Sequence, residues 1–228
     1  MLLDEEIKIL QSMEKDENTK FDIEEAIDHG VLVSNLAVNL ARELGMDDEF
    51  CYDIAIAGIL HDIGKLKLGN YLYGRRKENL KIEEMRYVRM HSTLGYEILK
   101  ETGKYSDRIL SWVLHHHENC DGSGYPGNLK EKEIPYGAKI LRVCDVFSAL
   151  VSIRPYRAAF DIEQTIELMI DEVKNFDMQV FLAFMKVVND ESFETIKSFI
   201  NSVNEHSEKR NRIIAAEKEK TDKIQMQQ

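Results

Sequence analysis

The sequence has few residues that interrupt helices and no long apolar run. It contains only three prolines and twelve glycines among 228 residues, which favours long helices joined by few turns. The longest uncharged, mainly apolar stretches are residues 31–41 and 54–60, far short of the roughly 20 residues that a membrane-spanning helix needs. We therefore expect no membrane span.

Cysteine is scarce, and positive charge is in the minority. The three cysteines, Cys51, Cys120 and Cys144, have no CxxC spacing, and the N-terminus lacks the basic region and cleavage site of a secretory signal. Both features favour a cytoplasmic location without a disulfide framework. Lys and Arg number 30 against 41 Asp and Glu, a net charge of −11. Because binding to DNA or RNA needs Lys and Arg to replace counterions, we expect no nucleic-acid partner.

Helical periodicity is what the sequence has in quantity, and no convincing run alternates with period two. One buried stripe, which ends at Gly45, consists of Leu32, Leu36, Leu40 and Leu44. Similar stripes occur within residues 162–173 and 193–203. We therefore predict an all-α fold. The expected helices span about 4–15, 21–44, 48–63, 81–102, 105–118, 135–152, 161–174, 177–189 and 191–225.

Composition divides the chain into three segments. Residues 1–20 form a short N-terminal helical segment that we expect to pack on the bundle or on a second subunit of a homodimer. Residues 21–203 form the main domain. Residues 204–228 are strongly charged and poor in apolar side chains, so we expect a solvated helical tail. Asp47 and Asp161 lie where N-caps would begin new helices.

The histidines are the candidates for chemistry. His61 is followed by Asp62, with Lys65 one turn later, at the end of an apolar run. A buried carboxylate needs a cation, and a metal ion supplies one; a buried ion pair is the alternative. Glu25 and His29 lie four residues apart and so point the same way from one helix, a ligand spacing that is also common on solvated faces.

Two further features fit the same chemistry. His116 and His117 are adjacent, so both side chains reach one site only if it is large or holds more than one metal ion. Asp145 lies in an apolar helix, where an unpaired acid is costly.

Five segments, in this order and spacing, resemble the HD-GYP family, a branch of the HD superfamily of metal-dependent phosphohydrolases. The resemblance covers roughly residues 21–200 and implies an all-helical bundle of the HD-domain type. The matching segments are 61–65 (HDIGK), 91–96 (HSTLGY), 116–126 (HHENCDGSGYP), 145–147 (DVF) and 154–157 (RPYR).

The resemblance implies a centre of two or three divalent metal ions. It implies that Asp62 bridges two ions and that Glu25 completes a third site, as the matching glutamate does in some members. Imidazole and carboxylate donors without thiolate suit Fe or Mn, whereas Zn favours four-coordinate sites. The implied metal ligands are Glu25, His29, His61, Asp62, His91, His116, His117 and Asp145.

The resemblance also implies an activity. Family members hydrolyse cyclic di-GMP to linear pGpG, and often on to GMP, by attack of a metal-bridging hydroxide. Asp62 and Lys65 would be catalytic, with Lys65 beside the substrate phosphate. Arg154 and Arg157 match a phosphate-contacting pair, and Tyr125 lies in the loop that shapes the pocket rim. Solvated arginines and a turn-stabilising tyrosine are the structural alternatives.

Some residues depart from the family pattern. Ser148 stands where an aspartate is usual, and residues 68–69 and 75–79 replace Ile-Pro and Lys-Pro-Gly segments. His115 and His206 lie outside the pattern, and we expect neither to bind metal. Two other functions therefore stay open: a catalytically weak cyclic-dinucleotide receptor or interaction module, and an HD phosphohydrolase for another nucleotide. The complete set of implied ligands favours the phosphodiesterase.

Overall fold

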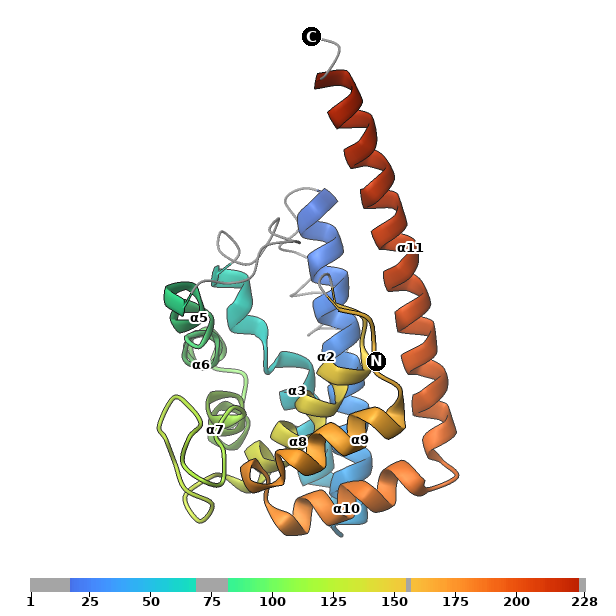
Figure 1. Cartoon of the computed structure of the whole chain (residues 1–228). Helices are drawn as coiled ribbons and strands as arrows, with labels where there is room; N and C mark the ends of the chain where they lie inside the picture. The colour runs from blue at the N-terminus through green and yellow to red at the C-terminus, as the bar shows by residue number, and fades with distance from the viewer. Residues whose placement is uncertain (1–16, 69–81, 155–156, 226–228) are drawn as a thin grey trace.

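The protein is all-helical, as the periodicity predicts (Figure 1). The computed structural model describes residues 17–68, 82–154 and 157–225, and no strand occurs within them beyond two isolated bridges, Asp121–Lys130 and Arg154–Arg157. The helices are α2 (Glu17–Glu43), α3 (Asp48–Leu60), η1 (Ile63–Leu68), α5 (Ile82–Val88), α6 (His91–Thr102), α7 (Asp107–His115), α8 (Tyr136–Val151), α9 (Ile162–Asp171), η2 (Val173–Asn175), α10 (Met178–Asn189) and α11 (Phe193–Gln225).

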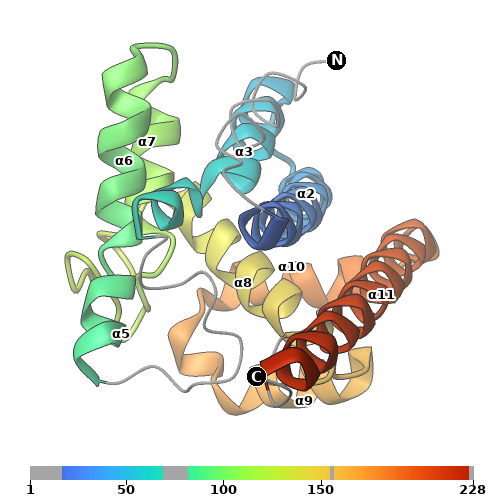
Figure 2. The same cartoon turned by 90° about the horizontal axis from the view of Figure 1, so that it is seen from above.

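The core lies between α2, α3 and α8. The predicted leucine stripe of α2 is confirmed, because Leu32, Leu36 and Leu40 are fully buried and Leu44 is partly buried against them. Viewed from above, α8 crosses the middle of the molecule, with α5, α6 and α7 on one side and α11 on the other (Figure 2). The central helices α2, α3 and α8 pack against one another and against α7, α9, α10 and α11.

Capping residues begin and end the helices where the sequence predicts. The Asp47 carboxylate accepts a hydrogen bond of 2.8 Å from the Phe50 N–H at the start of α3. Asp161 and Gln164 form a capping box at the start of α9. Gly45 follows α2 with a φ of 73°, a left-handed conformation that glycine adopts without steric cost.

Four predicted helices are shorter or more divided than expected. The helix expected over 161–174 ends at Asp171 and is followed by η2. The helix expected over 81–102 is two helices, α5 and α6, separated at Arg89 and Met90, and those expected over 48–63 and 105–118 end at Leu60 and His115. Each of these last three differences ends a helix just before a histidine of the site described below. Periodicity reports which face is buried and not where the helix ends, so it did not detect these ends.

The charged C-terminal part continues the last helix without a break. α11 runs from Phe193 to Gln225, and its end extends beyond the other helices (Figure 1). Packing extends past the boundary predicted at residue 203, because Ser207 is buried and Arg210, 11% exposed, pairs with Asp28 on α2 at 3.3 Å. The charge of this segment therefore does not mark the end of the packed structure.

The predictions for the N-terminal region and for the apolar stripe within residues 162–173 have mixed outcomes. The helix expected over 4–15, and residues 69 and 75–79 that depart from the family pattern, lie outside the described residues, and α2 begins at Glu17, before the expected residue 21. In the stripe predicted within residues 162–173, Met169 is buried and Ile162, Ile166 and Val173 pack against the core, whereas Ile170, which was also assigned to the stripe, is 50% exposed. None of the described helices is both long and apolar enough to cross a membrane.

Candidate metal centre

Helix ends bring the histidines together. His61 directly follows α3, His91 begins α6 after the break from α5, and His116 directly follows α7. The last carbonyl groups of a helix have no partner within the helix. In each case the histidine Nδ1–H donates to a carbonyl three residues earlier. These acceptors are the oxygens of Gly58, Val88 and Val113, at 2.8, 2.6 and 2.6 Å respectively.

These hydrogen bonds determine the tautomer of each ring. A neutral imidazole that donates through Nδ1 carries its lone pair on Nε2, so three Nε2 atoms are available as metal ligands. The same bonds hold the rings in fixed orientations. The protein's own hydrogen bonds therefore orient a set of Nε2 acceptors without the help of a cation.

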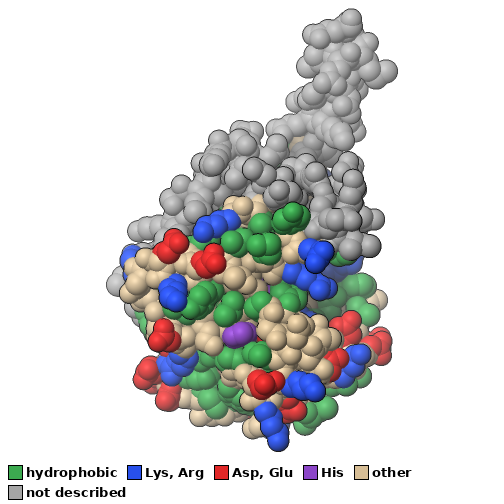
Figure 3. All heavy atoms as spheres, turned by 90° about the vertical axis from the view of Figure 1, so that its left-hand side faces the viewer, with side chains coloured by type: hydrophobic (Ala, Val, Ile, Leu, Met, Phe, Trp, Pro, Cys, Tyr) green, Lys and Arg blue, Asp and Glu red, His purple; other side chains and the backbone are tan. Residues whose placement is uncertain are grey.

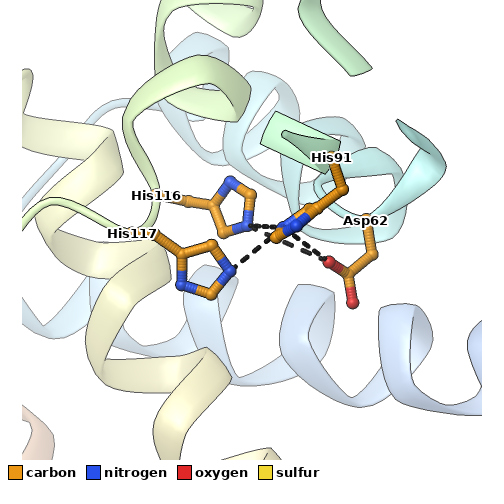
Figure 4. Close-up of side chains that lie close together, drawn as sticks. All are labelled: Asp62, His91, His116 and His117. Carbon is orange, nitrogen blue, oxygen red and sulfur yellow. Dashed lines mark hydrogen bonds and ion pairs between the residues drawn. The ribbon is translucent and has the colours of Figure 1, made fainter. Parts of the chain in front are cut away.

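The first group of donor atoms comes from Asp62, His91, His116 and His117, all within 4.8 Å of one another (Figure 4). His91 is at the centre of the group. Its Nε2 lies 3.2 Å from Asp62 Oδ1, 3.2 Å from His116 Nε2 and 3.0 Å from His117 Nε2. Neighbouring donor atoms bound to one cation at about 2.1 Å lie about 3 Å apart, so these spacings suit a shared ion.

The second group consists of His29, His61 and Asp145. Asp145 Oδ1 lies 3.0 Å from His29 Nε2 and 3.6 Å from His61 Nε2. The two groups adjoin, because Asp62 Oδ2 is 3.5 Å from His61 Nε2 and Asp145 Oδ2 is 3.9 Å from His117 Nδ1. Seven of the eight predicted ligands thus form one continuous cluster.

Glu25 is the predicted ligand that belongs to neither group. Its Oε1 lies 3.2 Å from Arg154 Nη1. The i, i+4 spacing does place Glu25 one turn before His29 on α2, as expected. In this structure its partner is a guanidinium and not the cluster.

The cluster fits divalent cations and does not fit an all-protein hydrogen-bond network. His91 and His116 both donate through Nδ1, so their Nε2 atoms face each other as two acceptors with no proton between them. His61 Nε2 and Asp62 Oδ1 are buried without any hydrogen-bond partner. Each such atom costs roughly 1–3 kcal/mol unless something satisfies it. Imidazole and carboxylate donors without thiolate are the set that first-row divalent metals accept.

Burial keeps most of the rings neutral. Burial and the neighbouring ring of His117 hold the pKa of His116 well below its usual value, and burial does the same to the pKa of His117 despite the carboxylate of Asp145. Burial also lowers the pKa of His29 and of His91, although the hydrogen bond to Asp145 and the charge of Asp62 oppose it. Neutral imidazole is the form that binds a metal ion.

The carboxylates of the cluster remain ionised. Burial would raise the pKa of Asp62, but the ammonium of Lys65 and the ring of His61 outweigh it and hold that pKa well below its usual value. Burial would likewise raise the pKa of Asp145, but the hydrogen bond from His29 and the charge of the His61 ring outweigh it and hold that pKa well below its usual value. His61 differs from the other rings. Burial lowers its pKa, but the charges of Asp62 and Asp145 outweigh that effect and raise it.

Gly64 sets the distance between η1 and α6. A Cβ at this position would lie 1.9 Å from the carbonyl oxygen of His91 and 2.6 Å from the nitrogen of Gly95, closer than any side chain tolerates. This close approach keeps Asp62 and Lys65 against His91, and Lys65 Nζ pairs with Asp62 Oδ2. The glycine within the HDIGK segment is therefore a packing requirement of the site.

The loop that contains Tyr125 folds against the cluster. The Tyr125 ring stacks on His117, with ring centroids 4.7 Å apart and an interplanar angle of 26°, and its N–H donates to the His117 carbonyl at 3.1 Å. The Arg89 guanidinium lies 5.4 Å from the Tyr125 ring centroid. Burial raises the pKa of Tyr125, so its hydroxyl stays protonated at neutral pH.

Two residues of this region were missed by the sequence analysis. The side chain of Glu118, 2% exposed as a residue, accepts hydrogen bonds from the N–H groups of Gly127 and Leu129, at 2.6 and 2.9 Å, and so closes the loop. An acid between two histidines and a glycine-rich stretch could have indicated this role. Arg89 carried no such signal, because its position depends on the helix break.

The two predicted phosphate-binding arginines have different surroundings. Arg154 is 22% exposed beside Glu25. Arg157 donates to the carbonyl oxygens of Ala149, Leu150 and Ala158, at 2.8, 3.2 and 2.7 Å, and lies over the Phe160 ring. Its guanidinium therefore holds the end of α8 in this structure.

The remaining positions noted in the sequence lie outside both donor groups. Ser148 is fully buried with an unpartnered hydroxyl. His115 lies 3.6 Å from Glu118, outside both donor groups, and His206 is exposed on α11. On the face in Figure 3, acidic and basic side chains of the described residues are interspersed with apolar ones. The coloured side chains on that face form no continuous basic area.

Comparisons with known proteins agree with the geometry. Residues 3–180 match the family model of the HD domain. The chain is 36% identical over 160 residues to a cyclic di-GMP phosphodiesterase of Pseudomonas aeruginosa, and 35% over 161 residues to one of Thermotoga maritima; each alignment covers 70% of this chain. It is 34% identical over 155 residues, 67% of the chain, to a 3'3'-cGAMP-specific phosphodiesterase of Vibrio cholerae. The matched parts are 38%, 44% and 36% of those proteins, so the chain spans less than half of their length.

Solved structures share the fold. An HDG"Y"P protein from Bdellovibrio bacteriovorus superposes with a TM-score of 0.60 at 21% sequence identity, covering 72% of this chain and 53% of that one. A cyclic GMP-AMP specific phosphodiesterase of Vibrio cholerae gives 0.58 at 15% identity, covering 77% and 51%. Fold, motif order and the matched domain agree: the chain belongs to the HD domain family, in its HD-GYP branch.

Proposed function

We propose that this chain is a metal-dependent phosphodiesterase that hydrolyses cyclic di-GMP, with pGpG or GMP as the end product. The observation that carries the proposal is the group of acceptors that face one another without a proton: His91 Nε2, His116 Nε2 and Asp62 Oδ1. The names of the relatives, which include cyclic di-GMP phosphodiesterases at 35–36% identity, support the substrate class.

The residues that would hold the cations are the two donor groups of the cluster. Two divalent ions, Fe or Mn, are the proposed cofactors, with Asp62 shared between them because its carboxylate faces both groups. When bound, such ions lower the pKa of a water molecule so that it is nucleophilic near neutral pH, and they offset the charge of phosphate oxygens. A third ion at Glu25 would require that carboxylate to leave Arg154.

The chain's own residues bind and orient the substrate. Lys65, 37% exposed beside Asp62, would offset charge on a phosphate at the cluster, and so would Arg154, which pairs with Glu25 one turn before His29. The Tyr125 ring, already stacked on His117, offers a surface for a guanine base, and its protonated hydroxyl donates a hydrogen bond. Arg157 has the weakest case for a phosphate contact, because it already donates to three carbonyls.

A different cyclic dinucleotide is the second candidate substrate. A relative at 34% identity is named as specific for 3'3'-cGAMP, and Ser148 replaces the aspartate usual in the family. A serine at this position lacks the carboxylate, so a hydrogen-bond acceptor and a negative charge are missing from the interior beside the site. Both dinucleotides therefore belong in the assay.

The test is turnover by protein purified anaerobically and loaded with Fe or Mn. We expect hydrolysis of cyclic di-GMP that disappears in Asp62→Ala, while Asp48→Ala, an exposed acid of α3, leaves it unchanged. Metal analysis of each sample shows whether the loss follows the loss of metal. A metal-loaded wild-type chain that binds cyclic di-GMP without cleaving it would instead be a receptor, and preferential cleavage of 3'3'-cGAMP would reassign the substrate.

A further inference from the structure

The C-terminal helix contacts the segment that carries Arg154. Asn204 on α11 donates from Nδ2 to the carbonyl of Val151 at 2.9 Å, and its Oδ1 accepts from the N–H of Ile153 at 3.0 Å. Val151 is the last residue of α8, so its carbonyl has no partner within that helix. One amide side chain thus supplies both a donor and an acceptor to a backbone more than 50 residues away in sequence.

Arg154 directly follows the residue that Asn204 holds. Its main chain pairs with that of Arg157, at 2.8 and 3.1 Å, and its guanidinium faces Glu25 on α2 at 3.2 Å. Hydrogen bonds to α11 on one side and an ion pair to α2 on the other therefore define where this guanidinium lies. The cluster is close to it, since Glu25 lies one turn before His29 on α2.

The end of α8 does not depend on Asn204 alone. The Arg157 guanidinium donates to the carbonyls of Ala149 and Leu150, so it caps the helix by a separate set of bonds. Asn204 is also only half-buried, and water replaces part of what its removal takes away. We therefore attribute to its two hydrogen bonds the orientation of the backbone after Val151 and not the stability of α8.

We propose that Asn204 is a positioning residue for substrate binding: it fixes the Val151–Ile153 backbone so that Arg154 is held where the substrate phosphate binds. The proposal rests on the proposed function, in which Arg154 contacts phosphate. It makes α11 part of the binding machinery although no residue of α11 belongs to the metal cluster. No pattern in the sequence of this charged helix singles out Asn204.

The kinetic test compares Asn204→Ala with a neighbouring control. We expect the KM for cyclic di-GMP to rise about tenfold in Asn204→Ala with kcat within about twofold of wild type, the split expected when binding rather than chemistry is lost. Metal content should not change. Asn201→Ala, an exposed asparagine on the same helix, should match wild type. A KM within twofold of wild type in Asn204→Ala would overturn the proposal.

A double-variant cycle identifies the route of the effect. If Asn204 acts only through Arg154, then adding Asn204→Ala to Arg154→Ala should leave the KM of the single Arg154 variant unchanged. An equal further tenfold rise would show that Asn204 acts by another route and would contradict the proposal.

A measurement without catalysis separates this proposal from the proposed function. Amide hydrogen exchange at Ile153 and Arg154 should become at least tenfold faster in Asn204→Ala and stay unchanged in Asn201→Ala, because Asn204 accepts from the Ile153 N–H. Unchanged exchange would overturn the positioning role in any circumstances. If exchange is faster in Asn204→Ala but the wild-type chain cleaves no cyclic dinucleotide, Asn204 still positions Arg154 and only the proposed activity is refuted.

Discussion

At the scale of single residues, the chemistry of the cluster follows from where each proton is held. Three helix-end carbonyls accept hydrogen bonds from the Nδ1–H groups of His61, His91 and His116. The Nε2 lone pairs of these rings are therefore directed into the cluster. Lys65 is the cation that the chain itself supplies to this group. Its ammonium pairs with the Asp62 carboxylate and remains partly exposed, so in the proposed function it would also offset charge on the substrate phosphate.

Replacing Lys65 by methionine should therefore lower turnover without removing the metal ions. We expect kcat/KM for the cyclic dinucleotide to fall about a hundredfold in Lys65→Met, because a charge that offsets the phosphate oxygens is lost, while metal content stays at the wild-type value. Lys67→Met, an exposed lysine of the same short helix, is the control and should be unaffected. Equal activity of the two variants would refute a role for Lys65 in catalysis.

At the scale of the elements, the site is built where helices stop. α3, α5 and α7 each end just before a histidine of the cluster, and their C-terminal ends carry partial negative charge that favours cations. The break between α5 and α6 is part of this design, since the Val88 carbonyl at the end of α5 holds the His91 ring. The contact of η1 with α6 then fixes Asp62 against His91.

Gly64 and Gly95 face each other across that contact and give a matched pair of variants. A Cβ on Gly64 would lie 1.9 Å from a backbone oxygen, whereas the nearest atom to a Cβ on Gly95 is 3.4 Å away. Gly64→Ala should lower the free energy of unfolding by about 1–3 kcal/mol, the usual cost of overpacking, and weaken metal binding. Gly95→Ala, inside α6, should be neutral or stabilising by up to about 1 kcal/mol. Denaturant unfolding and metal titration check both, and similar losses in the two variants would contradict the packing argument.

At the scale of the whole molecule, the sequence predicted which helix faces are buried better than it predicted the contacts between distant segments. Periodicity identified the buried faces of α2 and α11 because burial repeats with the helix turn, and the order of the motifs identified seven residues that do meet. Neither periodicity nor motif order predicted that Arg154 pairs with Glu25 or that Arg157 caps α8. They also did not predict the hydrogen bond between Asn204 and the Ile153 N–H. These contacts join residues far apart in the chain and leave no local pattern.

Removal of metal should destabilise the whole fold, because the cluster connects α2, α3, α6, α7 and α8. A ligand that binds only the folded state stabilises it by RT ln(1 + [L]/Kd), about 2.7 kcal/mol at a hundredfold excess over Kd. We therefore expect chelation to lower the free energy of unfolding by about 2–3 kcal/mol, and added Mn²⁺ to restore it in a concentration-dependent way. Asp62→Ala, which lacks the shared carboxylate, should show little of this dependence in denaturant titrations with and without metal. If chelation strips the metal from the wild-type chain and its unfolding curve does not move, the buried unpartnered atoms of His61 and Asp62 are satisfied by something other than a cation.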